Sequence, residues 1–106
     1  MSEWSVTYAK EAVNDLKSLD RSQQLQVLKA IKKVSENPLP NSEGGYGKPL
    51  GNNLTSKLTG YLKIKLVKVG LRVVYTLVRT ENTMRIIIIS VRDDDTVYKM
   101  AQERIK

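Results

Sequence analysis

Hydrophobic and polar positions recur with two different periods along this chain, and each period predicts a different kind of element. Residues 4–8 carry apolar or aromatic side chains at alternate positions, which predicts a short strand. From residue 10 to residue 36 the apolar positions instead recur every three or four residues, in two stretches. The predicted apolar stripe of the second stretch is Leu25, Val27, Leu28, Ile31 and Val34. Asp20 and Ser22 stand between the stretches as candidate helix caps. The pattern therefore predicts two helices, over about 10–19 and from the caps to about residue 36, joined as an antiparallel hairpin.

The second half of the chain returns to the period of strands. Residues 38–60 are rich in Gly, Pro, Asn and Ser and predict a loop whose length suggests a functional or mobile segment. Three β-prone runs follow, separated by turn residues, at 61–67, 71–79 and 84–91. The last run contains four consecutive isoleucines, which predicts a central strand buried on both faces.

Three aspartates at 93–95 favour the start of a last, short helix over 96–105, because acidic side chains suit the positive end of the helix dipole. The order of elements is then β-α-α-β-β-β-α. We expect a small single domain over residues 1–106 of the α+β class, with a mainly antiparallel sheet packed against the N-terminal helical hairpin and a short C-terminal helix.

Composition narrows the possible chemistry. The chain has neither cysteine nor histidine, which excludes disulfides, Cys/His zinc sites and histidine-dependent catalysis. Acid–base chemistry must come from Lys, Arg, Tyr, Asp or Glu. The first residues show no secretory signal, and the longest apolar run is far shorter than the ~20 residues of a membrane span. We expect a cytoplasmic protein without a membrane partner and without a metal or other cofactor.

The positive charge is concentrated in one third of the sequence. The chain carries a net charge of +7, and residues 57–92 hold eight cations and one anion, so this segment accounts for all of the excess. A concentrated positive field favours a polyanionic partner such as nucleic acid. A solvated basic sheet face would show the same charge, so charge alone leaves both interpretations open.

Two lysines on one predicted strand are the first candidates for chemistry. Strand alternation places Lys63 and Lys65 on the same face, which we expect to be exposed because the residues between and beside them are apolar. Like charges about 7 Å apart repel each other, which favours the neutral amine that a general base requires. Arg72 begins the next strand, just across the turn. An ordinary polar strand face would also carry this pattern.

Two further candidates follow the last predicted strand. Arg92 lies where that strand meets the helix, and Tyr98 comes six residues later at the edge of the helix's apolar stripe. A half-exposed tyrosine beside cations suits the stacking of a base while the cations hold its phosphates. A tyrosine that merely covers the sheet edge is the alternative. Lys57 and Lys68 are candidate RNA-binding residues in the same basic segment.

These motifs together resemble the RelE toxins of bacterial toxin–antitoxin pairs. The family pattern has a Lys-x-Lys strand, a glycine turn, Arg-hydrophobic-Val-Tyr on the next strand, and an Arg followed by a Val-Tyr pair. The matching segments are Leu-Lys-Ile-Lys-Leu at 62–66, Gly-Leu-Arg-Val-Val-Tyr at 70–75 and Arg-Asp-Asp-Asp-Thr-Val-Tyr at 92–98. The N-terminal strand and helical hairpin match as well, so the resemblance covers nearly the whole chain.

The resemblance implies an endoribonuclease that cuts messenger RNA in the ribosomal A site, with the RNA's own 2′-hydroxyl as nucleophile and no metal. It assigns the base to Lys65, with Lys63 assisting it and contacting phosphate. Arg72 stabilises charge on the phosphate, Arg92 stabilises or protonates the leaving oxygen, and Tyr98 stacks on a base. The implied partners are the ribosome with its message and a RelB-like antitoxin whose binding segment is acidic and amphipathic.

Two other functions remain open at this point. A ParE-like toxin shares the fold, inhibits DNA gyrase and cleaves no RNA. A basic RNA-binding domain without activity would share the charge. The cluster of Lys63, Lys65, Arg92 and Tyr98 argues against the ParE-like alternative, because a gyrase-binding module has no need of a catalytic cluster.

Overall fold

The computed structural model describes residues 4–49, 60–90 and 103 of the chain. Its elements, with η for a short 3₁₀ turn, are β1 (Ser5–Tyr8), α1 (Lys10–Lys17), α2 (Arg21–Val34), η1 (Asn41–Glu43), β2 (Lys48–Pro49), β3 (Tyr61–Leu66), η3 (Val67–Val69), β4 (Leu71–Val78), η4 (Arg79–Glu81) and β5 (Thr83–Ser90). The last helix expected over 96–105 lies outside the described residues.

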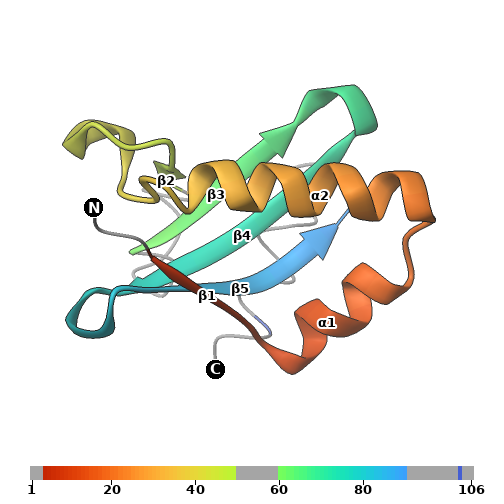
Figure 1. Cartoon of the computed structure of the whole chain (residues 1–106), viewed down its shortest axis with the longest axis horizontal. Coiled ribbons are helices and arrows are strands. Elements are labelled where there is room, and N and C mark those ends of the chain that lie inside the picture. The colour runs from red at the N-terminus through yellow and green to blue at the C-terminus, as the bar shows by residue number, and fades with distance from the viewer. Residues whose placement is uncertain (1–3, 50–59, 91–102, 104–106) are drawn as a thin grey trace.

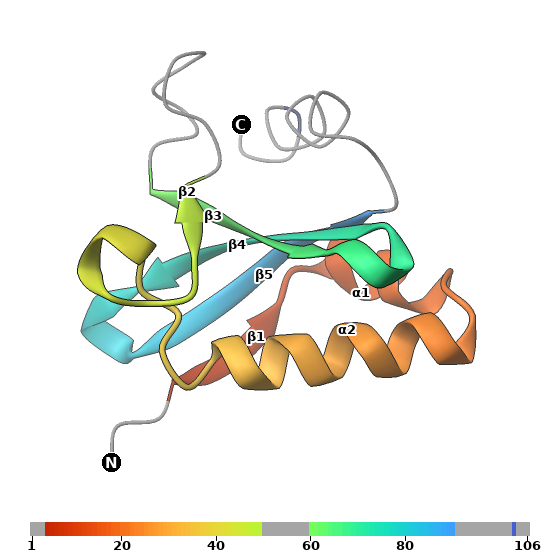
Figure 2. The same ribbon diagram turned by 90° about the horizontal axis from the view of Figure 1, so that it is seen from above.

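One sheet carries all of these strands, in the order β1-β5-β4-β3-β2. All neighbours are antiparallel except β1 and β5, which are parallel. Figures 1 and 2 show α1 and α2 on the same face of the sheet. The predicted α+β class is confirmed. The pattern alone could not show that the first strand lies beside the last, because strand order depends on contacts between distant segments.

The helical hairpin forms where the sequence indicates. Asp20 caps α2 with a capping box: its carboxylate accepts from the Gln23 backbone N–H at 2.8 Å, and the Gln23 side chain accepts from the Asp20 N–H at 3.2 Å. The helix then buries Val27, Ile31 and Val34 against the sheet.

The apolar stripe expected on α2 was too wide. Leu25 and Leu28 also belonged to that predicted stripe, yet their side chains are 56% and 42% exposed. Leu28 follows the buried Val27 by one residue and is therefore rotated by about 100° around the helix, away from the core. Both leucines face outward, and the core needs only the narrower stripe.

The core lies between the hairpin and the central strands. Ile86 to Ser90 are all buried, which confirms that this strand is central and covered on both faces. Tyr75 on β4 is fully buried, and its hydroxyl donates to the backbone carbonyl of Pro38 at 2.8 Å. This bond joins the middle of the sheet to the segment that follows α2.

The segment expected to be one long loop contains structure. Of residues 38–49, three form η1 and two form β2, which extends the sheet beyond β3. Gly47 lies so close to the core that a Cβ atom there would collide with the Tyr75 hydroxyl. Glycine and proline content indicated a loop, but the pairing of so short a strand depends on β3, which the local sequence does not reveal.

Candidate functional site

The side chain of Tyr75 serves as a reference that shows which face of the sheet each candidate side chain occupies. Tyr75 points toward the helical side, because its hydroxyl reaches Pro38 at the end of α2. Successive residues of a strand point to opposite faces, so Arg72 on β4 points away from the helices. Lys63 and Lys65 share that face, because they pair directly with Val74 and Arg72.

Lys65 and Arg72 are direct cross-strand neighbours. Residues so paired have Cβ atoms about 4.5–5.5 Å apart, so both cationic heads can reach one phosphate group. The turn between them sets this register, since Gly70 takes the left-handed conformation (φ +67°) that ends η3. Lys65 is exposed and Arg72 is half-buried, with its Nη1 donating to the Leu71 carbonyl at 3.3 Å.

The expectation of two exposed lysines side by side was wrong for Lys63, which is only 8% exposed. Along the sheet, Lys63 pairs with Lys48 of β2 on one side and with Val74 of β4 on the other. Lys63 is therefore inside the sheet, whereas Lys65 lies beyond the end of β2. We call Lys63, Lys65 and Arg72 the sheet cations.

Two residues join this site that sequence reasoning missed. Lys48 lies directly opposite Lys63 and so adds an exposed cation to the same face. Ser90 on β5 pairs with Arg72, which places a buried hydroxyl-bearing residue in the same row as Lys65 and Arg72. No local signal marked either residue, because each enters the site only through strand pairing.

Of the remaining candidates, Lys68 alone lies among the described residues. Arg92, Tyr98 and Lys57 lie outside the described residues. Lys68 is exposed in η3, where it lines a groove with α2. Because that groove also contains Leu66, whose neighbour Lys65 points to the opposite face, Lys68 belongs to the helical side of the molecule.

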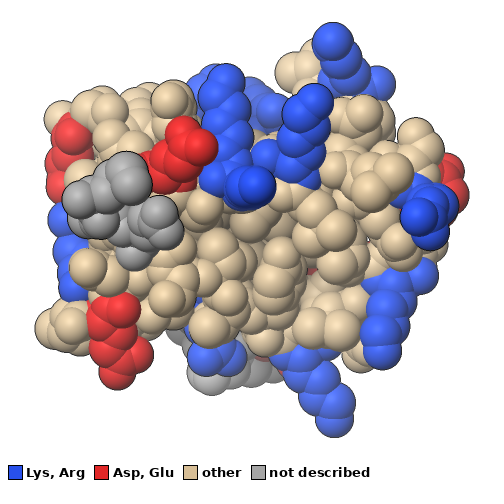
Figure 3. Space-filling view, viewed as in Figure 1, with Lys and Arg blue, Asp and Glu red and all other residues tan. Residues whose placement is uncertain are grey.

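Figure 3 shows the helical side with its charges. Basic side chains gather along one margin of α2 and at the turn between β3 and β4, while acidic side chains lie mainly toward the end that carries η1 and η4. The positive field that the sequence predicted therefore reaches both faces of the sheet, although the sheet cations occupy only one.

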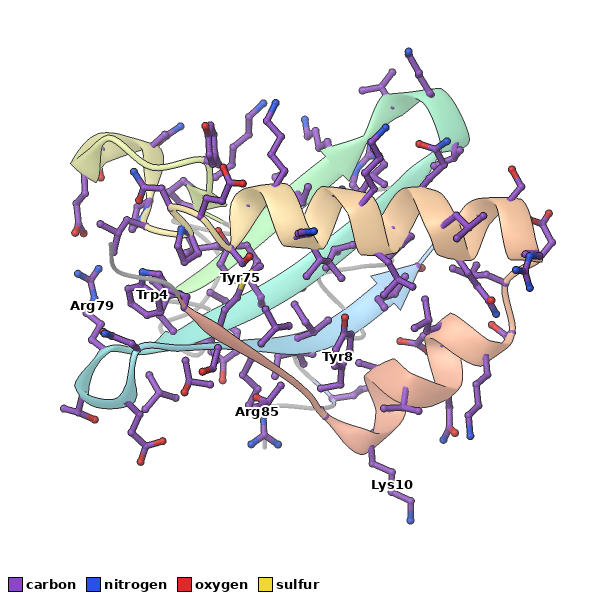
Figure 4. The ribbon with its side chains drawn as sticks, viewed as in Figure 1. Trp4, Tyr8, Lys10, Tyr75, Arg79 and Arg85 are labelled. Atoms are coloured by element: carbon purple, nitrogen blue, oxygen red, sulfur yellow. The ribbon has the colours of Figure 1, made fainter. Side chains whose placement is uncertain are left out.

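A pocket of about 360 Å³ lies apart from the sheet cations, where β3 begins and β4 ends. At its rim the Arg79 guanidinium donates to both carboxylate oxygens of Glu43, at 3.0 and 2.9 Å. Figure 4 shows Arg79 at this end of the molecule. The hydrogen bonds from Arg79 hold the pKa of Glu43 below its usual range. Because the pair neutralises itself, this pocket lacks the uncompensated charge that a phosphate site needs.

Among the described residues, no group of three or more His, Cys, Asp or Glu side chains is arranged to hold a metal ion. Within the same part of the chain, no helix has both the length and the apolarity to cross a membrane.

Comparison with known proteins identifies the family. The model of the family described as the ParE toxin of the type II toxin–antitoxin system parDE matches residues 6–98. The chain belongs to this family. It is a toxin of the RelE/ParE superfamily, which confirms the resemblance drawn from the sequence. A putative RelE-like toxin protein of Escherichia coli is 27% identical over 107 residues, covering 97% of this chain and 98% of that protein.

Solved structures of RelE-type toxins share the fold. A mutant of the E. coli toxin RelE in the free state matches with a TM-score of 0.74 at 22% identity, over 99% of this chain and 100% of that one. The toxin–antitoxin complex RelBE of E. coli matches with a TM-score of 0.66 at 19% identity, covering 85% and 98% of the two chains. A RelBE-type complex of Mycobacterium tuberculosis matches at 0.69 and 22%, covering 87% and 94%.

Proposed function

We propose that this toxin is a ribosome-dependent endoribonuclease that cleaves messenger RNA in the A site and thereby inhibits translation. The observation that carries the proposal is the direct pairing of Lys65 with Arg72 on the sheet face opposite the helices, with Lys63 two residues away. A proton acceptor and a fixed cation that can reach one phosphate are the minimum for cleavage by an internal 2′-hydroxyl.

The reaction can be written with these residues. Lys65, as general base, takes the proton of the 2′-hydroxyl, and the resulting oxyanion attacks the adjacent phosphorus atom. Arg72 stabilises the charge that develops on the phosphate oxygens, and Lys63 contacts the same phosphate. The bond from phosphorus to the 5′-oxygen breaks, and the leaving oxygen takes up a proton, from Arg92 in this scheme or from water, which gives a 2′,3′-cyclic phosphate and a 5′-hydroxyl. The nucleophile belongs to the substrate, so this scheme uses no cofactor.

The RelE resemblance supplies the remaining roles. Arg92 would stabilise or protonate the leaving 5′-oxygen, and Tyr98 would stack on a base and orient the attack. Lys57 and Lys68 would add contacts to RNA phosphates outside the reacting group. Dependence on the ribosome follows if the message must be bent to bring the 2′-hydroxyl into line with the phosphorus atom.

A toxin of this kind must be held inactive in its own cell, and we infer a RelB-like antitoxin as its partner. Support comes from the solved complexes that share the fold, which pair RelE-type toxins with RelB-type antitoxins. The other partner in this proposal is the ribosome with its message, and its support is the position of the positive charge.

The decisive experiment is single-turnover cleavage of ribosome-bound message, mapped by primer extension. Lys65→Ala should lower the rate by about 10²–10⁴ and Arg72→Ala by about 10²–10³, the usual contributions of a general base and of one charge-stabilising donor. Lys65→Arg keeps the positive charge but cannot act as a base, so it should bind ribosomes and still fail to cleave. Lys10→Ala removes an exposed cation of α1 and serves as the control. Full activity in Lys65→Arg would rule out the proposed base.

One observation favours a second function. The family model that matches the chain bears the name of the ParE toxin. A ParE-like protein would inhibit DNA gyrase and leave the message intact, so a supercoiling assay with the same protein separates the two. Inhibited supercoiling without cleavage on ribosomes would favour the gyrase function.

A further inference from the structure

The pocket of about 360 Å³ at the end of the sheet has the walls of a small binding site. Tyr61 at the start of β3 and Thr76 near the end of β4 line it from the sheet. Pro40, Ser42 and Pro49 line it from the segment that follows α2. The tyrosine ring and the two prolines form apolar walls, and the serine and threonine add hydroxyl groups. Pockets of this size and kind hold small ligands that combine an apolar body with a few polar atoms.

Contacts around the pocket hold its walls in place. Pro49 pairs with a residue of β3, and Pro40 forms a bridge with Gly47. The two hydrogen bonds from Arg79 to Glu43 tie η4 to η1. Figures 1 and 2 show the segment that carries η1 at the end of the sheet where β3 begins. A site that is already formed loses less conformational entropy when its ligand binds.

Strand register puts this pocket in line with the sheet cations. Tyr61 precedes Lys63 by two residues and Lys65 by four, and β3 pairs with β4 without a register shift, so the three side chains share one face. Thr76, which pairs with Tyr61, lies on the same face. At about 3.3 Å per residue, Tyr61 lies about 7 Å along the strand from Lys63 and about 13 Å from Lys65. One or two nucleotides of an extended RNA strand span such a distance.

The charge of the pocket distinguishes it from a phosphate site. Among its described lining residues Arg79 alone is charged, and the guanidinium is already paired with Glu43. The Thr76 hydroxyl donates to the Gly60 carbonyl at 3.2 Å, so its oxygen still presents lone pairs to an N–H donor. A nucleobase offers what this lining can bind, namely a flat π-face for the tyrosine ring and donors and acceptors along its edge.

We propose that this pocket binds a base of the RNA strand held by the sheet cations, about one or two nucleotides from the phosphate at Lys65 and Arg72. We call it the base pocket, and it is lined by Pro40, Ser42, Pro49, Tyr61, Thr76 and Arg79. The Tyr61 ring stacks on the base, and the hydroxyls of Ser42 and Thr76 bond to its edge. The identity of the strand as messenger RNA rests on the proposed function above. In that function, the base pocket selects where the message is cut.

Two other ligands fit the base pocket less well. A phosphate group would meet Arg79, whose guanidinium already donates to both carboxylate oxygens of Glu43. An apolar side chain of a partner protein would fill the volume, but it would cover the Ser42 hydroxyl without offering it a hydrogen bond, which is unfavourable. A base satisfies both the apolar walls and the hydroxyls.

Backbone NMR of the ¹⁵N-labelled chain tests the proposal without any cleavage. The probe is a short single-stranded RNA with a 2′-O-methyl group on every ribose, which removes the nucleophile, and it is compared with a strand that has the same phosphates and no bases. The complete probe should shift the amide signals of Tyr61 and Thr76 together with those of Lys65 and Arg72. The base-free strand should shift only the second pair. The proposal is wrong if the complete probe leaves the first pair unshifted, or if both strands shift it equally.

Matched variants test the role of the aromatic ring. Tyr61→Leu keeps an apolar side chain but removes the π-face, so it should weaken binding of the complete probe by at least about 5-fold, the lower end for one base stacked on an aromatic side chain. Tyr61→Phe keeps the ring and should stay within about twofold of the unaltered protein. Tyr46→Leu makes the same change at an exposed tyrosine outside the described lining and is the control. Equal weakening by the two leucine variants would overturn the proposal. The comparison of the two probes uses the unaltered protein, so it decides the matter even if Tyr61→Leu does not fold.

Primer extension on ribosome-bound message keeps this inference distinct from the proposed nuclease function. Tyr61→Leu should still cleave, because the sheet cations are intact, but its cuts should be spread more evenly along the message. Tyr61→Phe should keep the original pattern. An unchanged pattern in Tyr61→Leu would contradict the selection of the cut by the base pocket. If the unaltered protein does not cleave, the nuclease proposal fails and the comparison of the two probes still decides on the base pocket.

Discussion

Replacing Tyr75 with phenylalanine tests how the middle of the sheet is tied to the segment after α2. The Tyr75 hydroxyl donates to the Pro38 carbonyl at 2.8 Å, and both residues are fully buried. Phenylalanine keeps the ring and its packing and removes only the donor. The variant therefore isolates one hydrogen bond between β4 and the chain that leads to β2.

The size of the effect follows from burial. Loss of the donor leaves a buried carbonyl oxygen without that partner, which costs about 1–3 kcal/mol. The ring is retained, so no cavity adds to this cost. A central value of about 2 kcal/mol corresponds to a fall in the melting temperature of about 10 °C for a domain of roughly 100 residues.

Urea unfolding followed by circular dichroism measures the change directly. Tyr46→Phe is the matched control, because Tyr46 is exposed and its substitution should change the free energy of unfolding by less than about 0.5 kcal/mol. An equally small change in Tyr75→Phe would refute the reasoning, since it would mean that the Pro38 carbonyl needs no partner or finds water. Unchanged m-values in both variants would show that the unfolded state is the same.

Four further outcomes are expected. Burial raises the pKa of Tyr75, so the folded state holds the hydroxyl proton more tightly than the unfolded state does. The free energy of unfolding should therefore fall as pH rises above about 10, and it should fall less in Tyr75→Phe. Gly47→Ala should destabilise the fold more than that variant does, because the new Cβ would collide with the Tyr75 hydroxyl, and thermal unfolding would show it. Asp20→Ala removes the capping box of α2 and should cost about 1 kcal/mol in urea unfolding, whereas Asp20→Asn should cost little. If Lys57, Lys68 and the sheet cations together contact three phosphates, affinity for single-stranded RNA should drop about 20-fold from 50 to 200 mM salt, and a flat response would exclude phosphate contact.

Local chemistry in the sequence determined most of the elements. The period of the apolar residues predicted both helices and the strands β1, β3, β4 and β5, and Asp20 marked the start of α2. Each of these features depends on residues that are close together in the sequence. They are the spacing of apolar side chains, the capping of a helix and the freedom of Gly70 to adopt positive φ. The resemblance of short motifs was enough to indicate the family, which the family comparison then confirmed.

Tertiary structure alone decided the environment of the candidate site. The sequence placed Lys63 and Lys65 on one face, and this is what strand pairing requires. It could not show that Lys63 is buried, because burial depends on how the elements around β3 pack in the fold. Lys48 and Ser90 entered the site through strand pairing.

Tertiary structure also decided that the side chains of Leu25 and Leu28 point outward. Both fit the helical period, but the width of the stripe that α2 buries is set by the sheet beneath it. Local sequence determines which way each side chain can point along a helix or strand. Which of those directions ends in the core, in a neighbouring strand or in water depends on the packing of elements that the local sequence does not contain.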